Sequence, residues 1–214
     1  MNIVILGPQG SGKGTQAELL AEKFGLFHIE SGKILREMAE ADERIRNMQK
    51  QGILVPDQET INYMENYITK NNISFKNLIF DGFPRSMSQY DLLKEWLKQK
   101  GAEIDYVIYL DVGEKTSIER LSSRRICEEC GEVYNLITKP PREMDKCDIC
   151  GGKLIQRNDD KPETIKKRLE IFRKETMPIV NHVKKEEKLI IVDSERPVKV
   201  IFKEILSKLG KKAK

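Results

Sequence analysis

A chain of 214 residues is long enough for one domain with a substantial core, or for a compact domain that carries small lobes. Its formal charge of +4 is a small excess over many charges of both signs, and only 7% of its residues are aromatic, which argues against a dedicated nucleic-acid-binding protein. The apolar run at 2–6 is too short for a signal peptide or a membrane span, so we expect a cytoplasmic protein with no membrane partner.

The first predicted strand, 2–6, leads into the glycine-rich stretch GPQGSGKGT at 7–15, and an amphipathic helical pattern follows at 16–24. Glycines let successive backbone N–H groups point at an anion, the helix adds the positive end of its dipole, and Lys13 supplies a mobile charge. A chance surface turn is the alternative, but the spacing favours a nucleotide-phosphate loop. Because a hydroxyl comes only two positions after Lys13, at Thr15, we expect phosphates and water to supply most of the magnesium ligands.

A second short strand is predicted at 26–29, where His28 is interpreted as a packed strand residue rather than a catalyst. Ser31 is placed to cap the helix that follows, and capping alone would explain its hydroxyl. An extended link at 53–56 precedes another helix, for which Asp57 is the expected N-cap.

The apolar run at 78–81 predicts a buried strand that ends in Asp81, and Arg85 follows it. Ligands gather at the carboxyl ends of strands in an open parallel sheet, so both side chains are expected to face the edge that carries the glycine loop. Two further strands are predicted at 106–110 and 189–193. Five strands that alternate with helices predict an α/β three-layer fold with a parallel sheet and right-handed crossovers.

Helices are predicted between and after these later strands, at 87–100 and 114–125. A long helical region begins with Asp160 as its expected cap and has Pro162 in its first turn. Pro178 is expected to kink this region, because proline lacks the N–H that the helix needs there.

One stretch lies between the predicted helix at 114–125 and the predicted helix that begins after Asp160. It interrupts the alternation of strands and helices and contains all four cysteines of the chain. They form two CxxC pairs separated by sixteen residues, which match a four-thiolate zinc site: Cys127, Cys130, Cys147 and Cys150. Disulfides and a redox pair are the alternatives, but a cytoplasmic chain disfavours disulfides, and a redox CxxC is not normally doubled. Zinc with four protein ligands is coordinatively closed, so we expect it to hold a small lobe together rather than to do chemistry.

Arginines gather at the borders of this cysteine lobe, whose interior is mixed in charge and contains several acidic residues. They are Arg120, Arg124, Arg125, Arg157 and Arg168. Such placement suits a hinged lid whose closure brings guanidinium groups onto phosphates. The rival interpretation is a zinc ribbon that binds nucleic acid.

The motifs together resemble adenylate kinases of the long type with a zinc-bearing lid, and the match covers nearly the whole chain in the right order. The residues that carry the resemblance are the glycine stretch 7–15, DGFPR at 81–85 with Gln89, the arginines of 120–125 and QRNDD at 156–160. The resemblance implies reversible, magnesium-dependent phosphoryl transfer, ATP plus AMP giving two ADP, by a monomer that maintains the adenine nucleotide balance. It also implies a core made of 1–29, 60–125 and 160–214, an AMP-binding lobe at 30–59 and a lid at 126–159.

The resemblance also assigns site residues position by position. It implies ATP contacts at Gly10, Ser11, Gly12, Lys13, Gly14, Thr15, Arg120, Arg124, Val133, Tyr134 and Arg196. It implies an AMP pocket made of Ser31, Arg36, Ile53, Leu54, Val55, Gly82, Phe83, Pro84, Arg85 and Gln89. Arg157 and Arg168 would bridge the two phosphate chains, and the expected catalytic set is Lys13, Arg85, Arg124, Arg157 and Arg168. Asp81 would order magnesium-bound water. Ser31, Lys33 and Ile53 depart from the residues usual in the family.

The chemistry of this reaction agrees with what the sequence lacks. An AMP phosphate oxygen is already an anionic nucleophile near neutral pH, so no general base is needed and the two histidines need not be catalytic. The alternative function is a P-loop ATPase with a nucleic-acid-binding zinc ribbon, which would hydrolyse ATP without a nucleotide acceptor and bind nucleic acid in a salt-sensitive way.

Overall fold

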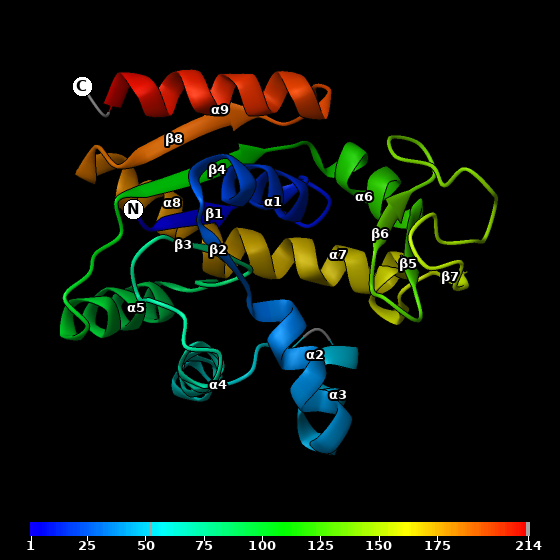
Figure 1. The fold of residues 1–214 in the computed structure, drawn as a ribbon, viewed down its shortest axis with the longest axis horizontal. Helices are drawn as coiled ribbons and strands as arrows, with labels where there is room; N and C mark the ends of the chain where they lie inside the picture. The colour runs from blue at the N-terminus through cyan, green and yellow to red at the C-terminus, as the bar shows by residue number, and fades with distance from the viewer. Residues whose placement is uncertain (52, 213–214) are drawn as a thin grey trace.

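The computed structural model describes residues 1–51 and 53–212, and a parallel sheet forms its centre (Figure 1). The strand order is β2-β3-β1-β4-β8, and every neighbouring pair is parallel. The strands are β1 (Ile3–Leu6), β2 (Phe27–Glu30), β3 (Leu78–Asp81), β4 (Tyr106–Asp111) and β8 (Leu189–Asp193). The prediction of five parallel strands is therefore confirmed. Continuous apolar runs such as 3–6 form such strands because both faces of the sheet are covered.

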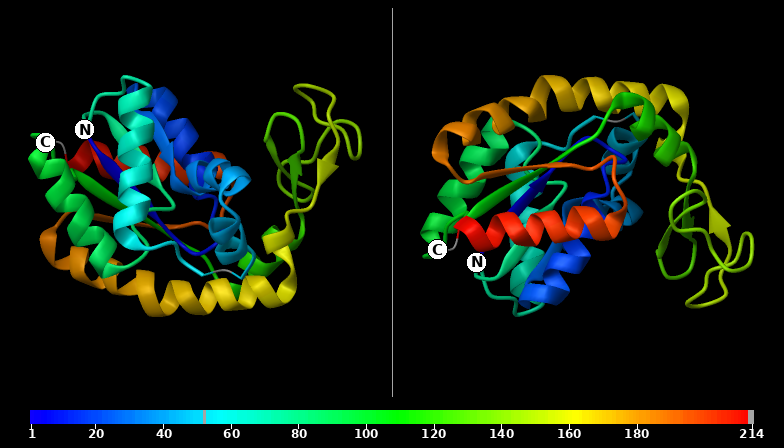
Figure 2. Two further views of the ribbon diagram at one scale, coloured as in Figure 1. Left: turned by 90° about the horizontal axis from the view of Figure 1, so that it is seen from below. Right: turned by 90° about the horizontal axis from the view of Figure 1, so that it is seen from above.

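Helices cover the sheet on both faces and complete three layers (Figures 1 and 2). On one face, α1 (Lys13–Phe24) and α9 (Val198–Lys212) pack Leu20, Ile201 and Ile205 against Ile3 and Ile5. On the other face lie α4 (Asp57–Lys70), α5 (Met87–Gln99) and α8 (Met177–Val183), with a second apolar core around the buried strand residues. None of the helices described is long and apolar enough to cross a membrane.

Two short helices, α2 (Ser31–Ala41) and α3 (Glu43–Gln51), follow β2 and stand beside the sheet as a small lobe (Figure 1). Leu35, Ala39 and Ile45 form its own apolar cluster with Val55. The extended link ends at α4, so the predicted order of elements in this region is confirmed.

The three predicted helix caps are wrong, at Ser31, Asp57 and Asp160. Ser31 is the first residue of α2 and its hydroxyl donates to the backbone oxygen of Asp81 at 3.3 Å. Asp57 is the first residue of α4 and its carboxylate accepts from Gln89 Nε2 at 2.8 Å. Asp160 lies in the 3-10 turn Asn158–Asp160, before α7 (Pro162–Ile171). The side chains bind groups distant in the sequence instead of the local backbone N–H groups.

The helix α6 (Glu114–Ser122) is shorter than predicted, because the arginines that follow it enter a strand. Strand β5 (Arg124–Cys127) pairs antiparallel with β6 (Val133–Asn135) and with β7 (Leu154–Ile155). This segment forms a strand because it pairs with residues 7–29 positions away in the sequence, so its local pattern did not reveal the strand. The resulting cysteine lobe projects from the sheet domain (Figure 2).

The helical region from Pro162 is irregular just before Pro178, the residue at which the sequence predicts a kink. A π turn, Phe172–Thr176, joins α7 to α8, and the 3-10 turn Lys184–Glu186 follows. A widened turn removes the conflict between the proline ring and the helix backbone that precedes it. Pro162 occupies the first turn of α7, as predicted.

Candidate functional site

The glycine loop links the end of β1 to the start of α1, at the position in the sheet where the strand order reverses. Gly10 and Gly12 have φ values of +83° and +86°, which side chains disfavour. A Cβ on Gly10 would also lie 2.8 Å from the Ser117 backbone oxygen. The tight loop and the N-terminus of α1 therefore form the anion-binding geometry that the sequence predicts.

Lys13 lies in this loop with its ammonium folded back onto backbone oxygens, at 2.7 Å from Gly7 O and 2.9 Å from Pro8 O. Burial lowers the pKa of Lys13 to about 8, and the opposing charge of Asp81 only partly offsets this. The positive charges of Arg85 and Arg168 lower the pKa further. A negative ligand at this position would relieve both effects.

Asp81 lies next to the loop because β3 pairs with β1 in register and places Asp81 opposite Ile5. Its carboxylate is 3.6 Å from a Cβ built on Gly14, and the side chain is largely buried. Asp81 Oδ2 is also 3.7 Å from His28 Nε2. Burial lowers the pKa of His28, but the hydrogen bond and charge of Asp81 outweigh it and raise that pKa above its ordinary value. A carboxylate is an oxygen donor of the type that suits magnesium and its water.

Four arginines from different elements surround the same edge of the sheet. They are Arg85 after β3, Arg124 at the start of β5, Arg157 before the 3-10 turn and Arg168 on α7. Burial lowers the pKa of Arg85, and burial also lowers the pKa of Arg168 to about 10. The structure thus brings together the five cations that the sequence analysis expected to act on phosphates.

Two adjacent aspartates hold three of these arginines. Arg124 forms a two-pronged ion pair with the fully buried Asp160, at 2.7 and 2.5 Å. Asp159 accepts from Arg157 at 2.7 and 2.8 Å and from Arg168 at 2.9 Å. Burial by itself would raise the pKa of Asp159, but Arg168 and Arg157 hold it well below its usual range. Sequence reasoning assigned no such role to this aspartate pair, although its position among arginines was a visible signal.

The residues expected around AMP lie on α2, in the link before α4, directly after β3 and on α5. Gly82 has a φ of +78°, and a Cβ there would lie 2.8 Å from Ser31 Oγ, so only glycine fits beside this hydroxyl. Gln89 Oε1 accepts from the Arg85 backbone N–H at 2.7 Å, while its Nε2 donates to Asp57. The amide keeps one further donor and one further acceptor site, as recognition of an adenine edge requires.

The other members of this expected pocket differ in exposure. Phe83 is buried, whereas Ile53 is exposed, and Leu54 and Val55 continue the extended segment. Lys33 is exposed on α2. The side chains of the extended segment therefore differ in accessibility to a ligand, because Ile53 is exposed and Val55 is buried.

The residues expected around the ATP base lie on the other side of the glycine loop. Arg120 donates to Gly10 O at 3.3 Å and to Ser194 O at 2.9 Å, so it joins the loop to the segment after β8. Arg196 lies in that segment and pairs with Asp193 and Glu204. The guanidinium groups of Arg120 and Arg196 therefore bind different partners, although both lie near the segment that follows β8.

The two expected lid contacts are not equivalent. Val133 is half exposed on β6, whereas the Tyr134 side chain is 2% exposed and lies inside the cysteine lobe. The Tyr134 hydroxyl accepts from the Asp148 N–H at 2.7 Å and lies 3.5 Å from Cys147 Sγ. The structure does not bring this side chain to the glycine loop.

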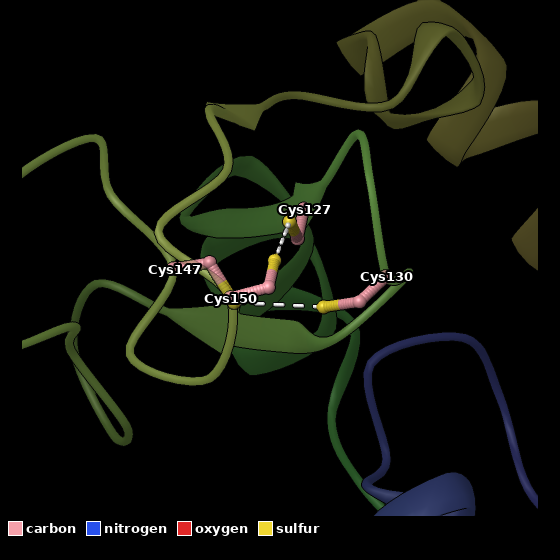
Figure 3. Close-up of side chains that lie close together, drawn as sticks. All are labelled: Cys127, Cys130, Cys147 and Cys150. Carbon is pink, nitrogen blue, oxygen red and sulfur yellow. Dashed lines mark hydrogen bonds between the residues drawn. The ribbon is translucent and has the colours of Figure 1, made fainter.

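The four cysteines form one cluster at the tip of two facing turns (Figure 3). The Sγ atoms of Cys127 and Cys150 are 3.4 Å apart, those of Cys130 and Cys147 are 3.6 Å apart, and all four lie within 4.8 Å of one another. Tetrahedral zinc with Zn–S bonds of about 2.3 Å separates its sulfurs by roughly 3.8 Å. The cluster fits that geometry and is far wider than a disulfide bond of about 2.05 Å.

The chemical environment of the cluster also suits a metal. The hydrogen bond from Tyr134 lowers the pKa of Cys147 to about 6, which favours the thiolate form of this sulfur. The thiolate is the form that binds metal ions. Gly131 and Gly151, which follow one cysteine of each pair, both have a φ of +75° and close the two turns.

Comparison with known proteins agrees with this geometry. A family model described as adenylate kinase matches residues 5–188. The chain is 40% identical over 211 residues to "Adenylate kinase" of Thermosipho africanus (strain TCF52B), covering 97% of this chain and 98% of the relative. It is 39% identical over 215 residues to "Adenylate kinase" of Archaeoglobus fulgidus, covering 99% of each chain. On the agreement of fold, loop, cation cluster and these matches, the chain belongs to the adenylate kinase family.

Proposed function

We propose that the protein catalyses the reversible, magnesium-dependent transfer of the γ-phosphoryl group of ATP to AMP, giving two ADP, and so maintains the balance of adenine nucleotides. The observation that carries this proposal is the convergence of Lys13 and four arginines on one edge of the sheet. The glycine loop lies on one side of this cluster and the Ser31, Gly82 and Gln89 group on the other. Two phosphate chains meeting end to end would both reach the cations between them.

The ATP site is built on the glycine loop. The backbone N–H groups of 10–15 and the Lys13 ammonium hold the phosphates, and Arg120 and the segment with Arg196 lie beside the base. Val133 and the Tyr134 backbone close over the nucleotide from the lid. The AMP site takes the phosphate on Arg36 and Arg85 and the adenine on Gln89, with 53–55 along one wall.

Transfer needs alignment and charge neutralisation rather than a base. A phosphate oxygen of AMP attacks the γ-phosphorus in line, and the bond to the β-phosphate oxygen of ATP breaks. Lys13, Arg85, Arg124, Arg157 and Arg168 stabilise the charge that spreads over the transferred group. Asp159 and Asp160 fix the direction of three of these arginines before substrate arrives.

Magnesium, when bound with ATP, neutralises charge on the phosphates. Asp81 would hold its water, and Thr15 lies close by in the first turn of α1. Closure of the cysteine lobe excludes bulk water, which would otherwise compete with AMP as the acceptor.

We further infer that a zinc ion bound by the four cysteines stabilises the lid, and that the enzyme is a cytoplasmic monomer that needs neither nucleic acid nor a membrane. All proposed ligands of both nucleotides come from one chain, which is consistent with activity as a monomer. The charged residues of the lid are of both signs, unlike a surface built for nucleic acid.

Replacing Arg85 with alanine tests the proposed division of the two sites. We expect the KM for AMP to rise at least tenfold, since a charge-assisted phosphate contact is lost, while the Kd for ATP changes less than threefold. The measurements are steady-state kinetics with each substrate varied, and calorimetric binding of ATP. Arg173→Ala, at an exposed arginine paired with Glu114, is the control and should behave like the wild type. Equal losses for both nucleotides would contradict the assignment.

The lowered pKa of Lys13 predicts proton uptake on ATP binding at high pH. The free ammonium has a pKa of about 8, and bound phosphates raise it, so at pH 8.5 the site takes up as much as about 0.8 proton. Affinity for ATP therefore falls as the pH rises through 8. Calorimetry of Mg-ATP binding in two buffers with different ionisation enthalpies measures the uptake. In Lys13→Arg the uptake should vanish, because arginine stays protonated; unchanged uptake there would refute this origin.

Removal of the metal tests the role of the cysteine cluster. We expect a chelator that strips zinc to lower the melting temperature by about 5–10 °C, as the loss of roughly 2–3 kcal/mol would do in a chain of this size. Cys130→Ser should melt at a similarly reduced temperature and respond little to the chelator. An unchanged melting temperature after metal loss, confirmed by elemental analysis, would contradict a stabilising role.

A further inference from the structure

Glu30 is an acidic residue inside the group of cations that we assign to the AMP phosphate. It is the last residue of β2 and directly precedes α2. Its carboxylate accepts a hydrogen bond from Arg36, with 2.7 Å between Glu30 Oε1 and Arg36 Nη2. Neither the resemblance nor the sequence pattern gives this carboxylate a function.

The carboxylate lies where two guanidinium groups converge. A Cβ built on Gly32 would lie 3.2 Å from Arg36 Nη1, 3.7 Å from Glu30 Oε1 and 4.0 Å from Arg85 Nη2. Because Gly32 has no side chain, it leaves a space that is bordered by Arg36, Glu30 and Arg85. An anion in this space would contact the same arginines that we assign to the phosphate of AMP.

The ion pair between Glu30 and Arg36 is placed so that an anionic ligand can replace the carboxylate. The side chains of Glu30 and Arg36 are 38% and 39% exposed, and an ion pair this accessible to water is weak. A phosphate dianion can bind Arg36 and Arg85 together and so competes well with a single carboxylate. The positive end of the α2 dipole also lies beside this position and favours a negative charge there.

We propose that the Glu30 carboxylate occupies the AMP phosphate position of the free enzyme and that AMP must displace it, so that Glu30 sets the affinity for AMP. This inference rests on the proposed function, because it takes Arg36 and Arg85 as phosphate ligands. Glu30 weakens AMP binding in two ways: it occupies Arg36, and after displacement it stays near a phosphate of the same sign.

Glu30→Gln tests the proposal, because it removes the charge and preserves the shape. We expect calorimetry to give a Kd for AMP about fivefold lower than that of the wild type, while the Kd values for adenosine and for Mg-ATP stay within twofold. Adenosine lacks the phosphate, so it separates an effect on the phosphate position from an effect on the pocket. Glu30→Ser should give the same direction and guards against a peculiarity of the glutamine amide.

Glu37→Gln is the matched control, because Glu37 is exposed on α2, the helix that Glu30 directly precedes, and its loss changes the net charge equally. It should leave all three affinities within twofold of the wild type. Unchanged or weaker AMP binding in both Glu30 variants would overturn the proposal, and so would equal tightening of adenosine. A wild-type protein that binds no AMP, or an Arg85→Ala variant with normal AMP binding, would instead refute the AMP pocket itself.

Discussion

Like charges held close together in a partly buried space are the constraint around which this structure is arranged. Lys13 and four arginines meet at the carboxyl edge of the sheet, where burial makes each charge costly and the neighbours repel one another. Carboxylates offset part of this cost: Asp81 lies near Lys13, and Asp159 and Asp160 hold the arginines. The carboxylates leave part of the repulsion between the cations uncompensated, so the electrostatic energy of the site falls when a polyphosphate binds.

The same constraint explains how the lobes are joined to the sheet. Arg124 and Arg157 lie on the two segments that connect the cysteine lobe to the core, and each binds an aspartate next to α7. The lobe is thereby attached to the cation cluster through the groups that would contact phosphate. On the opposite side, the pair of Glu30 and Arg36 repeats this arrangement at the start of α2. Carboxylates therefore hold cations in place at both borders of the site, and we propose that a phosphate replaces the exposed carboxylate of Glu30.

Much of the fold could be predicted from the sequence, because parallel strands buried on both faces are continuous apolar runs and the glycine loop fixes the first strand and helix. The wrong predictions share one physical cause. Ser31, Asp57 and Asp160 have the right residue types to cap a helix, but their side chains bind partners 32–50 residues away. The strand at Arg124 likewise depends on antiparallel pairing that no local pattern encodes.

The residues of the site also divide into those that a local sequence pattern predicts and those that only the fold reveals. Residues with a fixed motif spacing could be assigned from the sequence: Lys13 lies among the other cations, and the four cysteines form one cluster of their own. The roles of Glu30 and Asp159 depend on which cations lie beside them in space, so the sequence alone did not reveal them.

The central claim is transfer between two adenine nucleotides. Its most direct test mixes the pure protein with Mg-ATP and, in turn, AMP, GMP, CMP and UMP, and follows the nucleoside diphosphates by chromatography. We expect rapid ADP formation with AMP alone; transfer to another monophosphate, or slow hydrolysis of ATP with none, would contradict transfer between two adenine nucleotides.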